Sequence, residues 1–260
     1  MTAALTGRIA LVTGGGRGIG RATAIALAAA GVDVAVAARS ADELEKTAEQ
    51  IRRLGRRAEA LVCDVTRRED IEGTLERVRH SLGEPSILVN NAGIAAGAKL
   101  SDTTDELWDR TMAVNVTGAF YWTRAIMPMM LKGGWGRVIN IASVAAKAAA
   151  PYMVAYAASK HALLGLTRAV ASEVAAKGVT VNAICPGYVE TPMTEGSIDN
   201  IQARTGRSQE DARKILEGFS PQSRLMTSEE VASIAAFLCT HEARGINGQG
   251  IVLDGGGFQG

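Results

Sequence analysis

Tyr156 and Lys160 lie four residues apart in a stretch, residues 155–177, that reads as helix. This spacing places both side chains on one helix face, so the lysine ammonium lies beside the tyrosine phenol and favours its ionised form. At roughly 4 Å and an effective dielectric constant of about 20, the attraction is on the order of 4 kcal/mol, or about three pKa units. The pair therefore predicts a tyrosine that exchanges protons near neutral pH. An exposed helix also carries such a pair for solubility alone, so this interpretation depends on the other motifs.

A glycine-rich turn near the N-terminus predicts a site for a dinucleotide. Gly14, Gly18 and Gly20 follow an apolar strand and open a helix. Glycines at such a turn let the backbone approach a pyrophosphate closely, and the helix N-terminus attracts its negative charge. The spacing departs from the Gly-x-Gly-x-x-Gly pattern, and a simple tight turn is the alternative. The strand before it and the helix after it favour phosphate binding.

The end of the second predicted strand bears on which dinucleotide is bound. A carboxylate there would bind the ribose hydroxyls of NAD, but the chain has Ala37, Ala38, Arg39 and Ser40. Arg39, together with Arg17 in the glycine-rich turn, predicts a cationic pocket for the 2′-phosphate of NADP. We therefore expect NADP(H), with NAD(H) as the alternative. Both arginines are also typical of a solvated surface, and Arg39 can stack on adenine in either cofactor.

Short apolar runs alternate with longer helical patterns along the whole chain. Strands are predicted at residues 9–13, 33–37, 58–63, 87–90, 136–141, 179–184 and 250–253. Capping-box patterns predict helix starts at Ser40, Thr66 and Thr227, and glycines predict helix ends at Gly31, Gly55 and Gly178. Strands that are apolar on both faces indicate a parallel sheet covered by helices on both sides. We expect an α/β fold, a single doubly wound Rossmann domain over residues 1–260 with about seven strands.

One segment interrupts this alternation. Residues 188–223 are more polar than the rest, contain several glycines, and lie between the sixth predicted strand and the last helix. Segments of this kind commonly move over an active site. We expect a mobile helical lid over the substrate.

The composition favours a small-molecule partner. The formal net charge of the 260 residues is +1 and there is no basic block, which argues against nucleic acid and anionic membranes. Residues 1–6 do not resemble a signal peptide, and the apolar stretch 22–38 is interrupted by Gly31 and Asp33, so we expect a cytoplasmic protein with no membrane span. Three cysteines lack the spacing of metal ligands and are expected to be buried reduced thiols, with no metal site: Cys63, Cys185 and Cys239.

Taken together, motifs along nearly the whole chain resemble the short-chain dehydrogenase/reductase family. They are Thr13-Gly14-x-x-x-Gly18-Ile19-Gly20, Asp64-Val65, Asn90-Asn91-Ala92-Gly93, Asn115, Ser143, Tyr156-x-x-x-Lys160 and Pro186-Gly187-x-x-x-Thr191. The resemblance implies that Asp64 meets the adenine, that Asn90 and Gly93 support the cofactor pocket, and that Thr191 contacts the nicotinamide carboxamide. The cofactor-binding residues expected on this basis are Gly14, Arg17, Gly18, Ile19, Gly20, Arg39, Asp64, Val65, Asn91, Ala92, Gly93, Tyr156, Lys160, Pro186, Gly187, Val189 and Thr191.

The resemblance also implies a catalytic tetrad of Asn115, Ser143, Tyr156 and Lys160, and each role has a physical reason. Ser143 would polarise the substrate carbonyl and Tyr156 would deliver the proton, while the cofactor supplies the hydride. Lys160 would lower the phenol pKa and bind the nicotinamide ribose, and Asn115 would hold a water that links the lysine to solvent. Two alternatives remain: Ser143 caps a strand end, and Asn115 satisfies backbone groups in a kinked helix.

The expected substrate is a ketone with a hydrophobic body. Its pocket should be walled by mainly apolar residues, namely Ile94, Ala95, Val144, Ala145, Met153, Tyr188 and Met193. Residues 159–162 and 184–193 resemble bacterial 3-oxoacyl-thioester and polyketide ketoreductases, which implies a β-ketoacyl or related ketone. Arginines in the lid would then meet the phosphates of a thioester carrier, or else form a solvated helical face: Arg204, Arg207 and Arg213.

Two other functions are weighed against ketone reduction. One is an NAD-linked secondary-alcohol dehydrogenase that works oxidatively on the same tetrad. The other is a cofactor-sensing protein that binds the cofactor without catalysing a reaction. The intact Ser143, Tyr156 and Lys160 argue against it.

Small and apolar residues in 104–130 and 155–177 suggest a subunit interface, with core packing as the alternative. The family resemblance implies a homotetramer.

Overall fold

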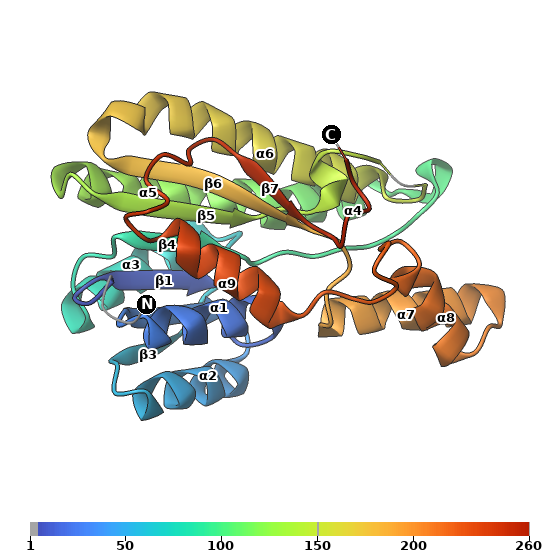
Figure 1. Ribbon diagram of the computed structural model, residues 1–260, viewed down its shortest axis with the longest axis horizontal. Coiled ribbons are helices and arrows are strands. Elements are labelled where there is room, and N and C mark those ends of the chain that lie inside the picture. The colour runs from blue at the N-terminus through green and yellow to red at the C-terminus, as the bar shows by residue number, and fades with distance from the viewer. Residues whose placement is uncertain (1–4, 150, 260) are drawn as a thin grey trace.

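Among residues 5–149 and 151–259, which this computed structural model describes, seven strands form one parallel sheet (Figure 1). The strand order is β3-β2-β1-β4-β5-β6-β7, and every neighbouring pair is parallel. The strands are β1 (Ile9–Thr13), β2 (Asp33–Ala38), β3 (Ala58–Val62), β4 (Ile87–Asn90), β5 (Gly136–Ile141), β6 (Val179–Pro186) and β7 (Gly250–Leu253). The predicted strands are therefore confirmed, and their ends shift by no more than two residues.

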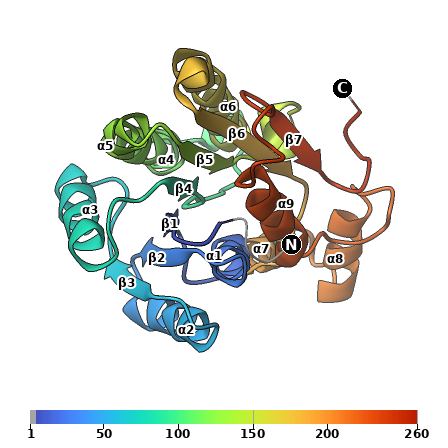
Figure 2. The same ribbon diagram turned by 60° about the vertical axis from the view of Figure 1, so that its left-hand side comes forward.

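Helices cover both faces of the sheet (Figure 2). The helices are α1 (Gly18–Ala29), α2 (Ala41–Arg53), α3 (Arg68–Ser81), α4 (Asp105–Met112), α5 (Gly118–Lys132), α6 (Val154–Val174), α7 (Pro192–Thr205), α8 (Gln209–Glu217) and α9 (Ser228–Leu238), with a π-helical turn, Ala113–Thr117, between α4 and α5. One apolar cluster joins the sheet to α1, α2 and α9, and another joins it to α3, α5 and α6. This is the α/β Rossmann architecture that the alternation predicted.

Side chains from neighbouring strand positions enter opposite clusters. Leu11 of β1 packs in the cluster under α3, α5 and α6, whereas Val12 packs in the cluster under α1, α2 and α9, and neither is exposed at all. Successive residues of a strand point to opposite faces, so a sheet buried on both sides needs apolar residues at every position. The continuous apolar runs of the sequence have this cause.

The predicted helix caps are confirmed in part. At α9, Thr227 and Glu230 form the complete capping box, each side chain bonding the backbone of the other. Ser40 precedes α2 without a side-chain cap, and α3 begins at Arg68, two residues beyond Thr66. The hydroxyl of Thr66 instead donates to Asp64 Oδ1 at 2.8 Å, because a local side-chain partner competes with the helix end. Those two predicted caps were wrong.

All strands end on the same side of the molecule, and the segments that leave this carboxyl end of the sheet carry most of the residues singled out above. The strand order reverses between β1 and β4, which makes their junction the expected place for a ligand. Helices α7 and α8, which occupy the segment predicted as a helical lid, project beyond the carboxyl end of β6 (Figure 1). Within the described part of the chain, no helix is both long and apolar enough to span a membrane. Residues 1–4, which entered the signal-peptide argument, lie outside the described residues.

Candidate active site

Helix α6 presents Tyr156 and Lys160 on one face, one turn apart. Lys160 is 5 % exposed, and its Nζ donates to the carbonyl oxygen of Ile141, at the end of β5, at 2.8 Å. The same Nζ lies 5.6 Å from the centroid of the Tyr156 ring. The predicted pairing of the two side chains on one face is present, but the ammonium is anchored on a strand carbonyl.

Burial acts on both ionisable groups, and it reverses the pKa shift predicted for the phenol. Loss of hydration raises the pKa of Tyr156; the Ser143 hydroxyl opposes this shift, while nearby Tyr188 and Cys185 add to it. Burial also lowers the pKa of Lys160 from 10.5 to about 8. The prediction from helix spacing was wrong in direction, because spacing gives the attraction between two charges and omits the cost of removing both from water.

Ser143 follows β5 and lies beside the phenol of Tyr156. Its hydroxyl oxygen accepts a hydrogen bond from the backbone N–H of Ala145 at 3.1 Å and thereby starts a single 3₁₀ turn, Val144–Ala146. The residue is 9 % exposed. Because the oxygen acts as an acceptor in this bond, the hydroxyl hydrogen can still be donated to the phenol oxygen of Tyr156 or to the carbonyl oxygen of a substrate. The strand-end cap considered above is thus present and does not use that donor.

Asn115 connects the segment after β4 to α6. Its Oδ1 accepts from the backbone N–H of Ile94 at 2.9 Å, and its Nδ2 donates to the Ile94 carbonyl and to Ser159 Oγ, each at 3.0 Å. Both amide hydrogens are therefore used by protein groups. A Cβ on Gly93 would lie 3.4 Å from Asn115 Oδ1 and 3.7 Å from Lys160 Nζ, so these three residues meet at one point. Asn115 therefore has the alternative role considered above, because its side chain satisfies backbone groups. These groups belong to Ile94 in the segment after β4 and not to the helix that carries Asn115.

The glycine-rich turn leaves room and hydrogen-bond donors for a phosphate. Helix α1 begins without a side-chain cap and without an acidic residue in its first turn, so its first N–H groups have no side-chain acceptor. Gly18 has a φ of +52°, and a Cβ there would lie 3.1 Å from the Thr191 methyl group. A Cβ on Gly20 would overlap the Gly14 carbonyl and Asn91 Nδ2. These residues fit a dinucleotide pyrophosphate between the turn and Thr191.

Asn91 and Thr13 hold this turn in place. Asn91 Nδ2 donates to the carbonyls of Thr13 and Gly14 at 2.9 and 3.1 Å, and Thr13 Oγ1 accepts from the N–H groups of Asn91 and Ala92, each at 3.0 Å. No role was predicted for Thr13, although its position directly before Gly14 was the available signal. Asn90 differs from the role expected of it, because its Nδ2 points into the fold and donates to Thr123 Oγ1 and Asn140 Oδ1.

The residues expected around the adenosine have carboxylate neighbours. Hydrogen bonds from Thr66 lower the pKa of Asp64, although burial opposes them, and the nearby Arg39 lowers it further. Arg17 forms an ion pair with Glu43 at 3.5 Å, with 63 % of the arginine side chain exposed. The two predicted phosphate-binding cations are thus exposed at the carboxyl ends of β1 and β2, and each lies near an acidic side chain. Sequence reasoning did not find Glu43, the fourth residue after Arg39.

The segment after β6 faces the glycine-rich turn. The Gly187 N–H donates to the Leu253 carbonyl at 2.9 Å, which ties this segment to β7, and Val189 forms a parallel bridge with Met226. Thr191 caps α7 by accepting from the Thr194 N–H at 3.4 Å. The methyl group of Thr191 therefore faces Gly18, while its hydroxyl oxygen accepts the hydrogen bond that caps α7.

Comparison with known proteins agrees with this geometry. The profile of the short chain dehydrogenase family matches residues 8–202. The chain belongs to the short-chain dehydrogenase/reductase family. A D-beta-hydroxybutyrate dehydrogenase of Rhizobium meliloti is 40 % identical over 255 residues, covering 96 % of this chain and 98 % of that protein. A 3-oxoacyl-[acyl-carrier-protein] reductase FabG of Pseudomonas aeruginosa is 37 % identical over 252 residues, covering 97 % and 98 %.

A solved structure matches the whole fold of this short-chain dehydrogenase/reductase. A variant of actinorhodin polyketide ketoreductase with NADPH superposes with a TM-score of 0.93 at 35 % identity, covering 98 % of each chain. The protein is accordingly an NAD(P)-dependent oxidoreductase that acts on CH–OH groups and their carbonyl counterparts. The family and the architecture predicted from the motifs are confirmed.

The remaining predicted substrate residues of this family member lie in the segments that follow β4, β5 and β6. Met153 forms a parallel bridge with Ala98, Tyr188 stacks on Phe219 with ring centroids 5.5 Å apart, and Met193 on α7 is 44 % exposed. The other predicted wall residues are partly exposed, namely Ile94, Ala95, Val144 and Ala145. Other predicted cofactor residues lie at the same end of the sheet, namely Ile19 at the start of α1, Val65 beyond β3 and Pro186 at the end of β6.

The three cysteines are free thiols inside the fold. Cys63, Cys185 and Cys239 are free and buried, and burial raises the pKa of Cys63 to about 11 and that of Cys239 to about 12. Over residues 5–149 and 151–259, no group of three or more His, Cys, Asp or Glu side chains is arranged to hold a metal ion.

Proposed function

We propose that the protein is an NADP(H)-dependent reductase that converts a hydrophobic ketone, such as a 3-oxoacyl thioester, to a secondary alcohol. The observation that carries this proposal is the meeting of Ser143, Tyr156 and Lys160 at the carboxyl end of the sheet, opposite the open N-terminus of α1. The ketoreductase and FabG relatives support the same reaction. The nicotinamide, when bound, supplies the hydride to the carbonyl carbon.

The side chains supply the hydrogen bonds and the proton. Ser143 donates to the carbonyl oxygen and stabilises the negative charge that develops there. Tyr156 then transfers its phenolic proton to that oxygen, so the carbonyl gains one hydride and one proton and becomes CH–OH. A raised pKa keeps the phenol of Tyr156 protonated at pH 7, which is the state that reduction requires. Lys160, with a pKa of about 8, can return a proton to the phenolate.

Asn115 acts as a positioning residue. Its bonds to Ile94 and Ser159 fix the segment after β4 against α6, which sets the place of Gly93 beside Lys160. Because both its amide hydrogens are used and its Oδ1 already accepts from Ile94, this side chain has no free hydrogen to donate to a water beside Lys160.

Replacing the proton donor tests the mechanism directly. Tyr156→Phe removes the phenolic hydroxyl and little volume, so the turnover number should fall about 10³-fold while NADPH affinity, from fluorescence titration, changes less than about twofold. Tyr152→Phe is the matched control, because Tyr152 is 56 % exposed and precedes the catalytic helix. Unchanged turnover of Tyr156→Phe contradicts the mechanism. Tight cofactor binding without turnover of any carbonyl compound would support the cofactor-sensing alternative.

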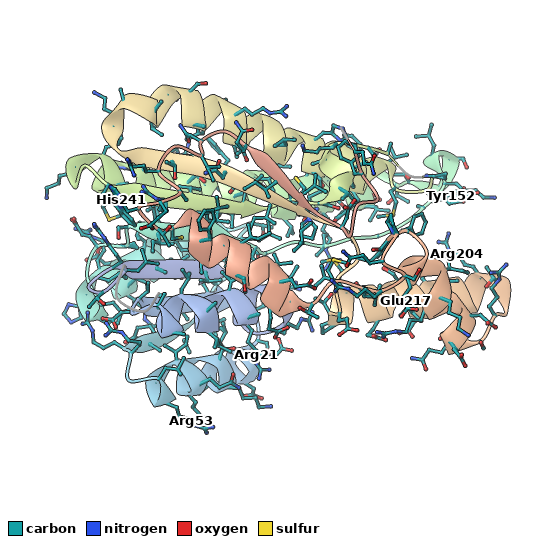
Figure 3. The ribbon with its side chains drawn as sticks, in the orientation of Figure 1. Arg21, Arg53, Tyr152, Arg204, Glu217 and His241 are labelled. Carbon is teal, nitrogen blue, oxygen red and sulfur yellow. The ribbon has the colours of Figure 1, made fainter. Side chains whose placement is uncertain are left out.

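The proposed NADP(H) preference rests on Arg39 and Arg17 and on the lack of a carboxylate at the end of β2. Arg39→Asp places a carboxylate where a 2′-phosphate would bind, so the ratio of NADPH to NADH affinity should fall at least about tenfold. Arg53→Asp reverses the same charge at the far end of α2, where Arg53 is exposed (Figure 3), and should leave the ratio unchanged. A ratio that survives Arg39→Asp means that Arg39 does not bind the phosphate.

An NAD-linked dehydrogenase working oxidatively on a secondary alcohol is the second candidate. The D-beta-hydroxybutyrate dehydrogenase relative at 40 % identity favours it. The ion pair of Arg17 with Glu43 favours it as well, because Glu43 offsets the positive charge that would bind the 2′-phosphate of NADP. Turnover of 3-oxoacyl thioesters, aryl ketones and secondary alcohols, each with NADP(H) and NAD(H), separates the two. Faster alcohol oxidation with NAD would select the dehydrogenase.

The segment around α7 and α8, residues 188–223, serves as a mobile lid on a single domain of residues 1–260. It carries Tyr188 and Met193 of the expected substrate wall. Exposed ion pairs of Arg213 join α8 to Glu190 and Glu195 within the segment, and Arg204 bonds the Gly97 carbonyl outside it. Subunits pair through the helices after β4 and β5 to form a homotetramer, which is consistent with the exposed Trp108 on α4 and Phe120 on α5. The cytoplasm is the expected compartment.

A further inference from the structure

The cations of the lid differ in their partners. Arg213 contacts three carboxylates, with N···O distances of 2.7 Å to Glu190, 3.6 Å to Glu195 and 3.0 Å to Glu217, and is therefore neutralised. Arg204, by contrast, has no ion pair within 4.0 Å among the described residues. Its Nη2 donates to one neutral acceptor, the Gly97 carbonyl, at 3.2 Å. Arg204 therefore keeps its charge and most of its donors.

This bond joins α7 to the segment after β4. Gly97 belongs to the segment after β4, and the neighbouring Ala98 donates its N–H to the Tyr152 carbonyl at 2.8 Å. A Cβ on Gly97 would lie 3.5 Å from Met153 Sδ, so Gly97 is packed against an expected substrate wall residue. Figure 3 shows Arg204 and Tyr152 at the end of the molecule from which α7 and α8 project. Arg204 is thus a cation at the rim of the expected apolar substrate wall.

The expected substrate wall offers no comparable partner for an anion. The expected wall residues are apolar apart from the phenol of Tyr188, and the Lys160 ammonium is bound to the Ile141 carbonyl. A carboxylate beside the reacting carbonyl would lose its water without gaining a cation. At the rim, a carboxylate or phosphate would displace the Gly97 carbonyl, because charge-assisted and bidentate bonds to a guanidinium are stronger than a bond to a neutral oxygen.

We infer that Arg204 selects ketones that carry an anionic group, a carboxylate or a phosphate, at the end distant from the reacting carbonyl. Met153 lies three residues before Tyr156 and packs against Gly97, the partner of Arg204, so this expected wall residue lies between the reacting end and the rim. The inference rests on the proposed ketone reduction at Tyr156, and it makes Arg204 a specificity-determining residue of that reaction.

Two matched substrate pairs test the inference with the purified full chain. One pair is a medium-chain ketone with a terminal carboxylate and its methyl ester; the other is 3-oxobutyryl-coenzyme A and its N-acetylcysteamine thioester. Arg204→Gln should lower kcat/KM about tenfold to a hundredfold for the charged member, mainly by raising KM, and less than about twofold for the neutral member. Arg204→Lys should restore part of the loss. The pair that responds identifies carboxylate or phosphate as the anion.

Lys214→Gln is the control, because it removes a positive charge from α8 of the same segment, where the side chain is 63 % exposed and pairs with Glu210. Equal losses in Arg204→Gln and Lys214→Gln overturn the inference, because they show that only the overall positive charge of the segment matters. Equal losses on charged and neutral substrates also overturn it, because Arg204 then only holds α7 against Gly97. No loss on either charged substrate also overturns it. Reduction of neutral ketones that depends on Tyr156 keeps the proposed function in each of these cases, whereas wild-type protein that reduces no ketone contradicts both.

Discussion

Helices α1 and α7 both begin at the carboxyl end of the sheet, yet their first turns are built differently. Helix α1 has no side-chain cap and no acidic residue in its first turn, and glycines pack it against backbone atoms. Helix α7 is capped by its own Thr191, starts with Pro192, and carries Glu195 in its first turn. The first helix leaves its N–H groups for a ligand, and the second satisfies its own.

The two regions also hold their charges differently. Lys160 on α6, at the candidate active site, is buried and bonds a strand carbonyl, whereas Arg213 on α8 is 37 % exposed and lies within 4 Å of three carboxylates. Burial fixes a side chain strongly and shifts its pKa, while exposed ion pairs stabilise weakly and are screened by salt. The comparison predicts that substitutions near α1 and α6 have large effects and those on the lid small ones.

Filling the glycine turn should have the largest effect. A Cβ in Gly20→Ala meets the Gly14 carbonyl and the Asn91 amide, which are fixed groups, so the free energy of unfolding should fall by about 3 kcal/mol and cofactor affinity should largely be lost. Gly73→Ala is the control: Gly73 is also helical, on α3, with nothing within 4 Å of the new Cβ. It should raise stability by roughly 0.5–1 kcal/mol in urea unfolding. Equal effects of the two changes would contradict the tight packing of α1.

The buried cation predicts a pH effect of known sign. The folded-state pKa of Lys160 is about 8 against 10.5 for the free group, so between these values the unfolded chain binds more protons than the folded one. The contribution of Lys160 to the free energy of unfolding therefore rises with pH from about 8 to 10.5, by at most about 3 kcal/mol, and is flat below pH 8. The difference between wild type and Lys160→Met, measured by urea unfolding at several pH values, isolates this group. A difference that does not change with pH means that Lys160 is not buried.

Breaking the lid network should have the smallest effect on global stability. Arg213→Met removes three ion pairs at a side chain that is 37 % exposed, so the loss should stay below about 1 kcal/mol and shrink in 1 M salt. Hydrogen exchange should nevertheless become faster in α7 and α8. Arg53→Met, which removes the exposed pair with Glu49, should change neither quantity. A large global loss would show that the lid and the body unfold as one unit.

The fold could be predicted well because each strand is marked in the sequence by its own continuous apolar run. Apolar runs such as residues 136–141 are buried on both faces, and a sheet covered on both sides needs that pattern. Positive φ angles at Gly31 and Gly178 follow from the same local chemistry. The caps at Ser40 and Thr66 failed because a side-chain hydroxyl has several partners within reach, and sequence does not rank them.

The candidate site was harder to predict where one residue depends on another element. The pKa of Tyr156 depends on burial and on Tyr188 and Cys185, which come from β6 and the segment after it. Lys160 finds its acceptor on Ile141, nineteen positions earlier in the chain. Spacing along one helix contains none of this information. The ion pair of Arg17 with Glu43 likewise requires the turn and α2 to be in place.

The two hydrogen bonds from Asn91 to Thr13 and Gly14 have a consequence for how the chain matures. These bonds join residues 77 and 78 positions apart, and β1 gains its second neighbour only when β4 docks. The chain must lose the entropy of closing a loop of that length before these contacts can stabilise it. An N-terminal fragment that ends before residue 91 therefore contains the glycine-rich sequence but not the folded turn that would bind the phosphates. Dinucleotide affinity therefore reports on completed long-range folding, and a saturating cofactor protects the native state alone from unfolding and proteolysis.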